Sequence, residues 1–241
     1  MGDMNPNFPT SPTVIFLIAI AFIFVALLVG IKSSLAAAQH SNQSGVTQTT
    51  AFLVASFLIG TAFMAKKGIF NNLDSFPPRI AFVLGPLIIL IVFLAFHKRV
   101  GQILEDVPAA WLIFPQVFRV AIEIVLWQLH DTNRYAPEQM TFEGLNFDII
   151  AGATAPLIAF LCFGQGRQLR TVALIWNFIS LGLLINIVTI SILSFPSIGA
   201  FDQSNTFIAW FPFIWLPTFA VPFAMFLHAM SIRQLLQKRS A

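Results

Sequence analysis

Two charged residues, Arg119 and Glu123, lie within an otherwise apolar stretch of this chain, one helical turn apart. At about 100° per residue, Gln116, Arg119, Glu123, Trp127 and His130 fall within an arc of about 80° on one face of a helix. A lone charge in the hydrocarbon of a membrane costs at least about 2.5 kcal/mol, so this polar stripe must face protein or water.

Two interpretations of the stripe remain open at this level. Arg119 and Glu123 have the i,i+4 spacing at which opposite charges pair on one helix, and such a pair would only position the helix. Alternatively, the stripe lines a cavity open to the outside, where Arg119 holds an anionic group and Glu123 binds a cation or a proton. Gln116 and His130 extend the polar face beyond what a pair requires, which favours the cavity.

Further polar residues are expected at the depth of the stripe. Asp148 and Asn186 are predicted to share one outer-leaflet layer with Glu123, with Arg119 beneath them. Asp148 also has a structural explanation, because Asn146 can cap the helix that Asp148 begins and an early acid complements the helix dipole. Asn177 and Asn186 lie nine residues apart and point to opposite faces of one helix. We expect Asn186 to join the layer and Asn177 to make a helix–helix hydrogen bond.

The segment after the stripe, residues 130–146, is polar and is expected to cover the outer end of such a cavity. It contains His130, Asp131, Glu138 and Glu143, but no two of these have a defined metal-ligand spacing, so no metal site is predicted. No cofactor is predicted either. His97 and His228 are both expected near the inner side, which makes a bis-histidine haem geometrically conceivable, yet His97 precedes two bases and reads as interfacial.

The elements that hold these residues are seven apolar segments, each about long enough to cross a bilayer. Their approximate ranges are 13–31, 49–66, 80–96, 108–129, 147–164, 171–194 and 206–232. The chain is 57% hydrophobic and 10% charged, well below the roughly 25% charged residues of soluble domains. We therefore predict an all-α integral membrane protein, a single polytopic domain over residues 1–241 that forms a bundle of seven transmembrane helices.

The distribution of basic residues predicts the orientation. With the N-terminus outside and the C-terminus cytoplasmic, eight bases lie on the inner side and four on the outer side, as the positive-inside rule requires. The inner bases are Lys32, Lys98, Arg99, Arg167, Arg170, Arg233, Lys238 and Arg239, and the outer ones are Lys66, Lys67, Arg79 and Arg134. The expected location is the plasma (inner) membrane.

Several functional classes are excluded by what the sequence lacks. All five lysines lie at segment ends, so none can hold retinal as in rhodopsins, and no phosphate-binding or hydrolase motif is present. The basic residues follow membrane topology and do not imply nucleic acid. The predicted function is binding of a small solute or ion in an outward-facing polar cavity, for transport or sensing, through Arg119, Glu123, Asn186, His130, Gln116 and Asp148. The alternatives are a membrane-embedded enzyme acting on a lipid-linked substrate, and a non-catalytic subunit that packs against other membrane subunits.

Overall fold

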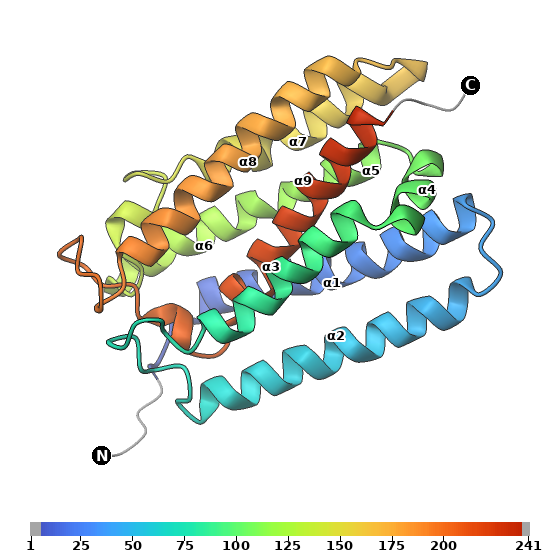
Figure 1. Ribbon diagram of the computed structural model, residues 1–241. Coiled ribbons are helices and arrows are strands. Elements are labelled where there is room, and N and C mark those ends of the chain that lie inside the picture. The colour runs from blue at the N-terminus through green and yellow to red at the C-terminus, as the bar shows by residue number, and fades with distance from the viewer. Residues whose placement is uncertain (1–5, 238–241) are drawn as a thin grey trace.

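The computed structural model describes residues 6–237, and all regular secondary structure within them is helical (Figure 1). The longer helices are α1 (Thr10–Ala37), α2 (Gln43–Lys66), α3 (Ala81–Phe96), α6 (Phe118–Asn133), α7 (Asp148–Phe163), α8 (Arg170–Leu193) and α9 (Val221–Leu236). The shorter helices are α4 (Lys98–Asp106) and α5 (Ala110–Ile113), with 3₁₀ turns at Phe114–Val117, Glu138–Met140, Gly164–Gly166 and Phe207–Ala209 and a π-helix at Leu216–Ala220.

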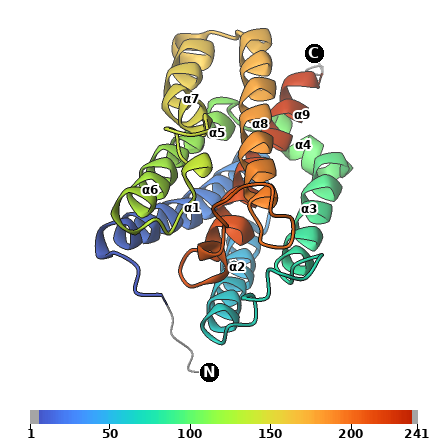
Figure 2. The ribbon, with the colours of Figure 1, turned by 90° about the vertical axis from the view of Figure 1, so that its left-hand side faces the viewer.

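Six helices in this part of the chain are long and apolar enough to cross a membrane, and α3 with α4 makes a seventh if that bent pair counts as one span. Successive long helices run back and forth between two ends of the molecule, and α1 begins at the end opposite to the one where α9 ends (Figure 1). Viewed from the N-terminal end, α7 and α8 lie together at one side and α2 at the other (Figure 2). Residues 6–237 are thus all-helical, and their several long apolar helices indicate a membrane-embedded protein.

The interior of the bundle is built around α6 and α9. Helix α6 packs against α1 and α7, whereas α9 packs against α3 and α8. By contrast, α2 and α3 expose large apolar side chains, including Phe52, Phe63, Phe82 and Phe96. Exposed apolar surface of this extent is typical of a membrane-facing flank.

The segment with the polar stripe is not one regular helix. A 3₁₀ turn at Phe114–Val117 separates α5 from α6, and Pro115 lies within it. Proline has no N–H to donate to the preceding turn, so the regular helix is interrupted there. The interruption places Gln116 in the 3₁₀ turn and Arg119 and Glu123 in the first turns of α6.

The last predicted segment, 206–232, was wrong at its start. The regular span begins at Leu216, and residues 211–214 before it form turns. The reason lies in Pro212 and Pro217, each of which removes a backbone donor. A π-helix carries the chain past Pro217 before α9 continues to Leu236.

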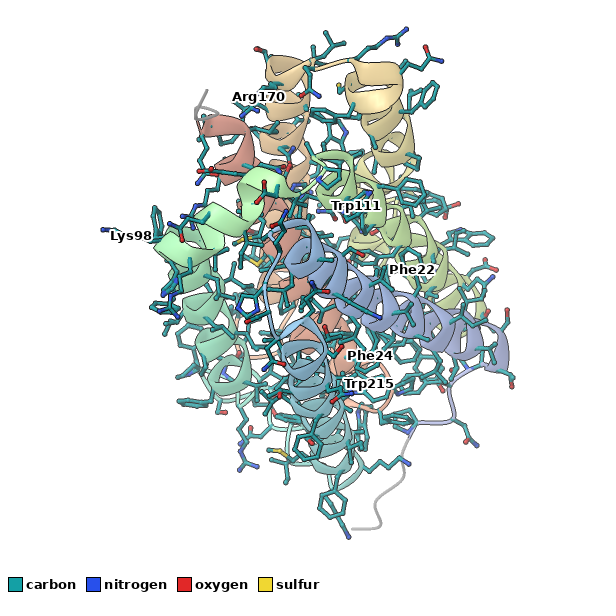
Figure 3. The ribbon with its side chains drawn as sticks, turned by 90° about the vertical axis from the view of Figure 1, so that its right-hand side faces the viewer. Phe22, Phe24, Lys98, Trp111, Arg170 and Trp215 are labelled. Atoms are coloured by element: carbon teal, nitrogen blue, oxygen red, sulfur yellow. The ribbon has the colours of Figure 1, made fainter. Side chains whose placement is uncertain are left out.

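Residues 98–106, expected to be an inner connection, form the amphipathic helix α4. This helix bends away from α3 by 68°. Gly101 and Leu104 are buried, whereas Lys98, Arg99 and Glu105 are exposed, and Figure 3 shows Lys98 at the periphery of the molecule. A short helix with one apolar and one charged face is suited to the membrane interface.

Two arginines, Arg170 and Arg233, join the ends of α3, α8 and α9. Arg170, at the start of α8, donates hydrogen bonds of 2.8–2.9 Å to the carbonyls of Gln234, Leu235 and Gln237 (Figure 3). Arg233 donates to the carbonyls of Leu94 and His97 at the end of α3. Both satisfy carbonyls that a helix C-terminus leaves without partners.

Candidate functional site

Arg119 lies at the centre of a buried polar network, with only 2% of its surface exposed. Its Nε donates to Asp148 Oδ2 at 2.6 Å, and its Nη2 donates to Asp148 Oδ1, so the two side chains form a bidentate ion pair. Nη2 also donates to the carbonyl of Ser180 at 3.2 Å. Arg119 on α6 is thereby joined to the first residue of α7 and to α8.

The remaining nitrogen of the guanidinium faces α9. Arg119 Nη1 lies 3.1 Å from His228 Nε2, and because arginine only donates, this ring nitrogen accepts. The other ring nitrogen, Nδ1, then carries the proton and donates to Asn177 Oδ1 at 3.0 Å. Asn177 Nδ2 donates in turn to Ser231 Oγ at 3.0 Å. Four of the five guanidinium N–H groups are therefore bound by the protein itself.

Glu123 has different surroundings, although it lies one turn from Arg119. Both of its carboxyl oxygens accept from Asn146 Nδ2, at 2.8 and 2.7 Å. Asn146 Oδ1 accepts from the backbone N–H of Asp148 at 3.0 Å, so Asn146 links Glu123 to the start of α7. The interpretation in which Arg119 pairs with Glu123 at i,i+4 was wrong. Arg119 forms its ion pair with Asp148, and Glu123 accepts hydrogen bonds from Asn146.

The structure places the other predicted site residues apart from Arg119. Gln116 is fully buried and donates to the carbonyl of Ala224 at 3.2 Å. His130 Nδ1 lies 3.0 Å from the carbonyl of Ala136, and Arg134 contacts its Nε2, so His130 holds the end of α6. Asn186 donates to the carbonyl of Leu145 at 2.9 Å and ties α8 to the preceding segment.

Asn177 makes the expected helix–helix hydrogen bond, to Ser231 of α9. The other half of the expectation was wrong, because Asn186 does not join Arg119 and binds the carbonyl of Leu145 instead. Asn177, not Asn186, belongs to the network of Arg119. The depth of this network is set by Ser180, whose carbonyl Arg119 contacts. Asn177 precedes Ser180 by about one turn. Asn186 lies about 9 Å beyond Ser180 along the helix axis, at about 1.5 Å per residue.

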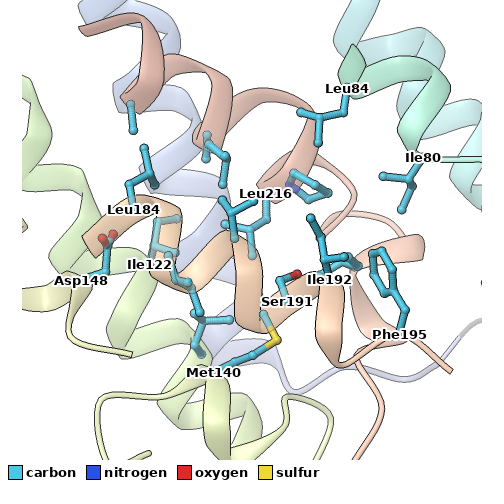
Figure 4. Close-up of a pocket in the computed structure, with 18 of the residues that line it drawn as sticks. Ile80, Leu84, Ile122, Met140, Asp148, Leu184, Ser191, Ile192, Phe195 and Leu216 are labelled. Carbon is cyan, nitrogen blue, oxygen red and sulfur yellow. The ribbon is translucent and has the colours of Figure 1, made fainter. Parts of the chain in front are cut away.

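Beside the network lies a chamber of about 280 Å³, formed between α3, α6, α8 and the π-helix with α9 (Figure 4). Its lining is apolar apart from Arg119, Glu123, Asp148 and Ser191. In Figure 4, Asp148 and Ile122 lie at one side of the chamber and Ile80 and Phe195 at the other. The chamber therefore combines an apolar body with a charged wall.

Exposure of the lining side chains shows where the chamber meets its surroundings. Phe76 is 75% exposed and Ile192 is 39% exposed, whereas Glu123 and Asp148 are buried. Phe76 lies in the segment between α2 and α3, and Ile192 lies in the last turn of α8. The mouth is thus bordered by exposed apolar side chains. Met140, from the 130–146 segment, contributes to the lining.

Sequence reasoning missed two of the partners that hold Arg119, namely Ser180 and His228. Ser180 contributes a backbone oxygen, for which the sequence carries no signal, and His228 was considered only as a haem ligand. Within residues 6–237, no three His, Cys, Asp or Glu side chains are grouped so that they could hold a metal ion. Neither a family model, nor a curated protein, nor a solved structure matches this chain.

Proposed function

We propose that this protein crosses the plasma membrane seven times, with the N-terminus outside, and binds a small lipid-soluble ligand in the chamber, for transport or sensing. The eight-to-four distribution of bases supports the orientation. With that orientation, the mouth at Phe76 and Ile192 lies toward the outer leaflet. A ligand would enter from the lipid, since the mouth is bordered by exposed apolar side chains.

The chamber itself is the observation that carries this proposal. A concave, mostly apolar site with a few convergent polar groups is the usual form of a small-molecule site. The apolar lining favours a ligand with a hydrocarbon body over the fully polar solute expected from the stripe alone. In this proposal the Arg119–Asp148 pair positions the wall, and Glu123 is the group that meets the ligand.

A membrane-embedded enzyme acting on a lipid-linked substrate is the second candidate. It is favoured by the position of a carboxylate, Glu123, beside an apolar chamber. However, Asp148 is engaged by Arg119, and Ser191 is the one hydroxyl in the described lining. Acid–base chemistry on a lipid substrate usually needs a second positioned group, so binding is the better-supported proposal.

Photo-crosslinking tests the binding proposal. Decanol carrying a diazirine on its chain is irradiated with the protein in lipid nanodiscs, and labelled residues are mapped by mass spectrometry. We expect labelling at Leu184, Val188 and Leu216, which line the chamber. Val188→Trp should fill the chamber and remove this labelling.

Ile185→Trp is the matched control, because Ile185 lies on the same helix but is exposed and does not belong to the lining. It should leave chamber labelling unchanged. Equal labelling of the chamber residues in both variants, or labelling confined to the exposed faces of α2 and α3, would contradict the proposal.

A further inference from the structure

Glu123 is the one charged group of the chamber that the described residues leave without a counter-charge. The charged side chains of the lining are Arg119, Asp148 and Glu123. Arg119 and Asp148 neutralise each other in the single ion pair found within residues 6–237. The charged wall therefore carries one carboxyl group more than it has cations.

The hydrogen bonds of Glu123 are also incomplete. A carboxylate has about four lone-pair positions, and in the described part of the chain its oxygens accept only from Asn146 Nδ2. If Glu123 is protonated instead, its O–H needs an acceptor, and Asn146 offers it only a donor. In either form, Glu123 has hydrogen-bonding capacity that its protein neighbours do not use.

This unused capacity is directed at an apolar space. A buried ionised group is expensive unless it is paired, and a ligand can supply the missing partner. A carboxylate- or phosphate-bearing ligand would meet a like charge at Glu123. Arg119 offers such a ligand at most one N–H group, since the other four are already bound.

Resting on the proposed ligand-binding function of the chamber, we propose that it selects amine-bearing amphiphiles and that Glu123 binds the amine. An ammonium group donates to the carboxylate and balances its charge. A neutral amine takes the proton of the carboxylic acid and gives the same ion pair. The alkyl part of the ligand then occupies the apolar body of the chamber between α3 and α8.

The experiment compares three competitors of equal chain length against the diazirine decanol probe in nanodiscs. These are decylamine, decanol and decanoate, each titrated with the free concentration corrected by empty nanodiscs. In the wild-type protein, decylamine should displace the probe at a concentration at least about tenfold lower than decanol, because charge-assisted hydrogen bonds are roughly twice as strong as neutral ones. Decanoate should be the weakest competitor.

Glu123→Gln keeps the shape of the side chain and removes its charge. In this variant, decylamine should lose its advantage over decanol as a competitor, because the carboxylate that pairs with the ammonium is gone. Equal competition in the wild-type protein, or an amine preference that survives in the variant, would overturn the amine assignment and leave chamber binding standing. Absence of probe labelling in the wild-type chamber would instead overturn both proposals. The wild-type comparison decides the question even if the variant does not fold.

Discussion

Arg119 on α6 and Asp148 at the start of α7 form a buried bidentate ion pair between residues 29 positions apart in the sequence. Their side chains are 2% and 6% exposed. The pair fixes the beginning of α7 against the middle of the adjacent span. It also turns the guanidinium away from Glu123, and this leaves Glu123 available to the chamber.

Removing one member of this pair should destabilise the protein strongly. For Arg119→Leu or Asp148→Leu alone, we expect a loss of about 3–5 kcal/mol, because each leaves an uncompensated buried charge. The double variant should recover much of this loss, which a double-mutant cycle on unfolding in detergent would measure. Glu143→Gln, at an exposed acid, is the control and should stay within about 0.5 kcal/mol of wild type. Additive losses in the double variant would contradict the pairing.

The sequence predicted that Arg119, Glu123 and Asp148 come together, and the structure brings all three to the wall of one chamber. This prediction was possible because a charged side chain within an apolar segment must find a partner inside the bundle. What it could not predict is which partner. The i,i+4 rule describes an isolated helix, whereas the long side chain of Arg119 reaches Asp148, Ser180 and His228 on three other elements.

The helices themselves were predictable to different degrees. Uniformly apolar segments such as α8 follow from length and hydropathy alone. Residues 206–215 are also apolar but contain Pro212, which has no backbone N–H to donate, and residues 211–214 around it form turns. Helix α4 was overlooked since it is short and half polar, and its place depends on contacts with α1, α3 and α9.

His228 should be needed for the stability of the network. His228→Leu leaves one N–H of Arg119 and the side-chain oxygen of Asn177 without partners, at a cost of about 1–3 kcal/mol. His228→Gln can accept from Arg119 and donate to Asn177, so it should restore part of the stability. Thermal unfolding in detergent measures both. His97→Leu, at the half-buried histidine that packs on Phe93, is the comparison and should cost less. An equal loss in the Leu and Gln variants of His228 would show that its hydrogen bonds contribute little.

Gly152 allows α7 to approach α6 closely behind Arg119. A Cβ at this position would lie 2.8 Å from the backbone nitrogen of Val120 and 3.1 Å from Arg119 Cβ. Gly152→Ala should therefore separate the helices and cost about 1–3 kcal/mol, as overpacking does. Gly182→Ala on α8 is the matched control, because a Cβ there would have no neighbouring atom within 4 Å and alanine is the better helix former by up to about 1 kcal/mol. Unfolding of the two variants should shift in opposite directions, and a neutral Gly152→Ala would contradict the close approach.

The proposed orientation predicts a specific pattern of chemical labelling. Ser204 and Gln168 are both exposed, Ser204 in the segment between α8 and α9 and Gln168 between α7 and α8, at opposite ends of the bundle. In a Cys162→Ser background, Ser204→Cys should react with an impermeant thiol reagent in intact cells, whereas Gln168→Cys should react only after permeabilisation. A cysteine at Asn5 is expected to react like Ser204→Cys, although Asn5 lies outside the described residues.

The physical basis of this prediction is the excess of bases at the end that contains Gln168, since cytoplasmic loops retain Lys and Arg. Labelling of Gln168→Cys without Ser204→Cys would reverse the orientation, and the mouth of the chamber at Phe76 and Ile192 would then open toward the inner leaflet.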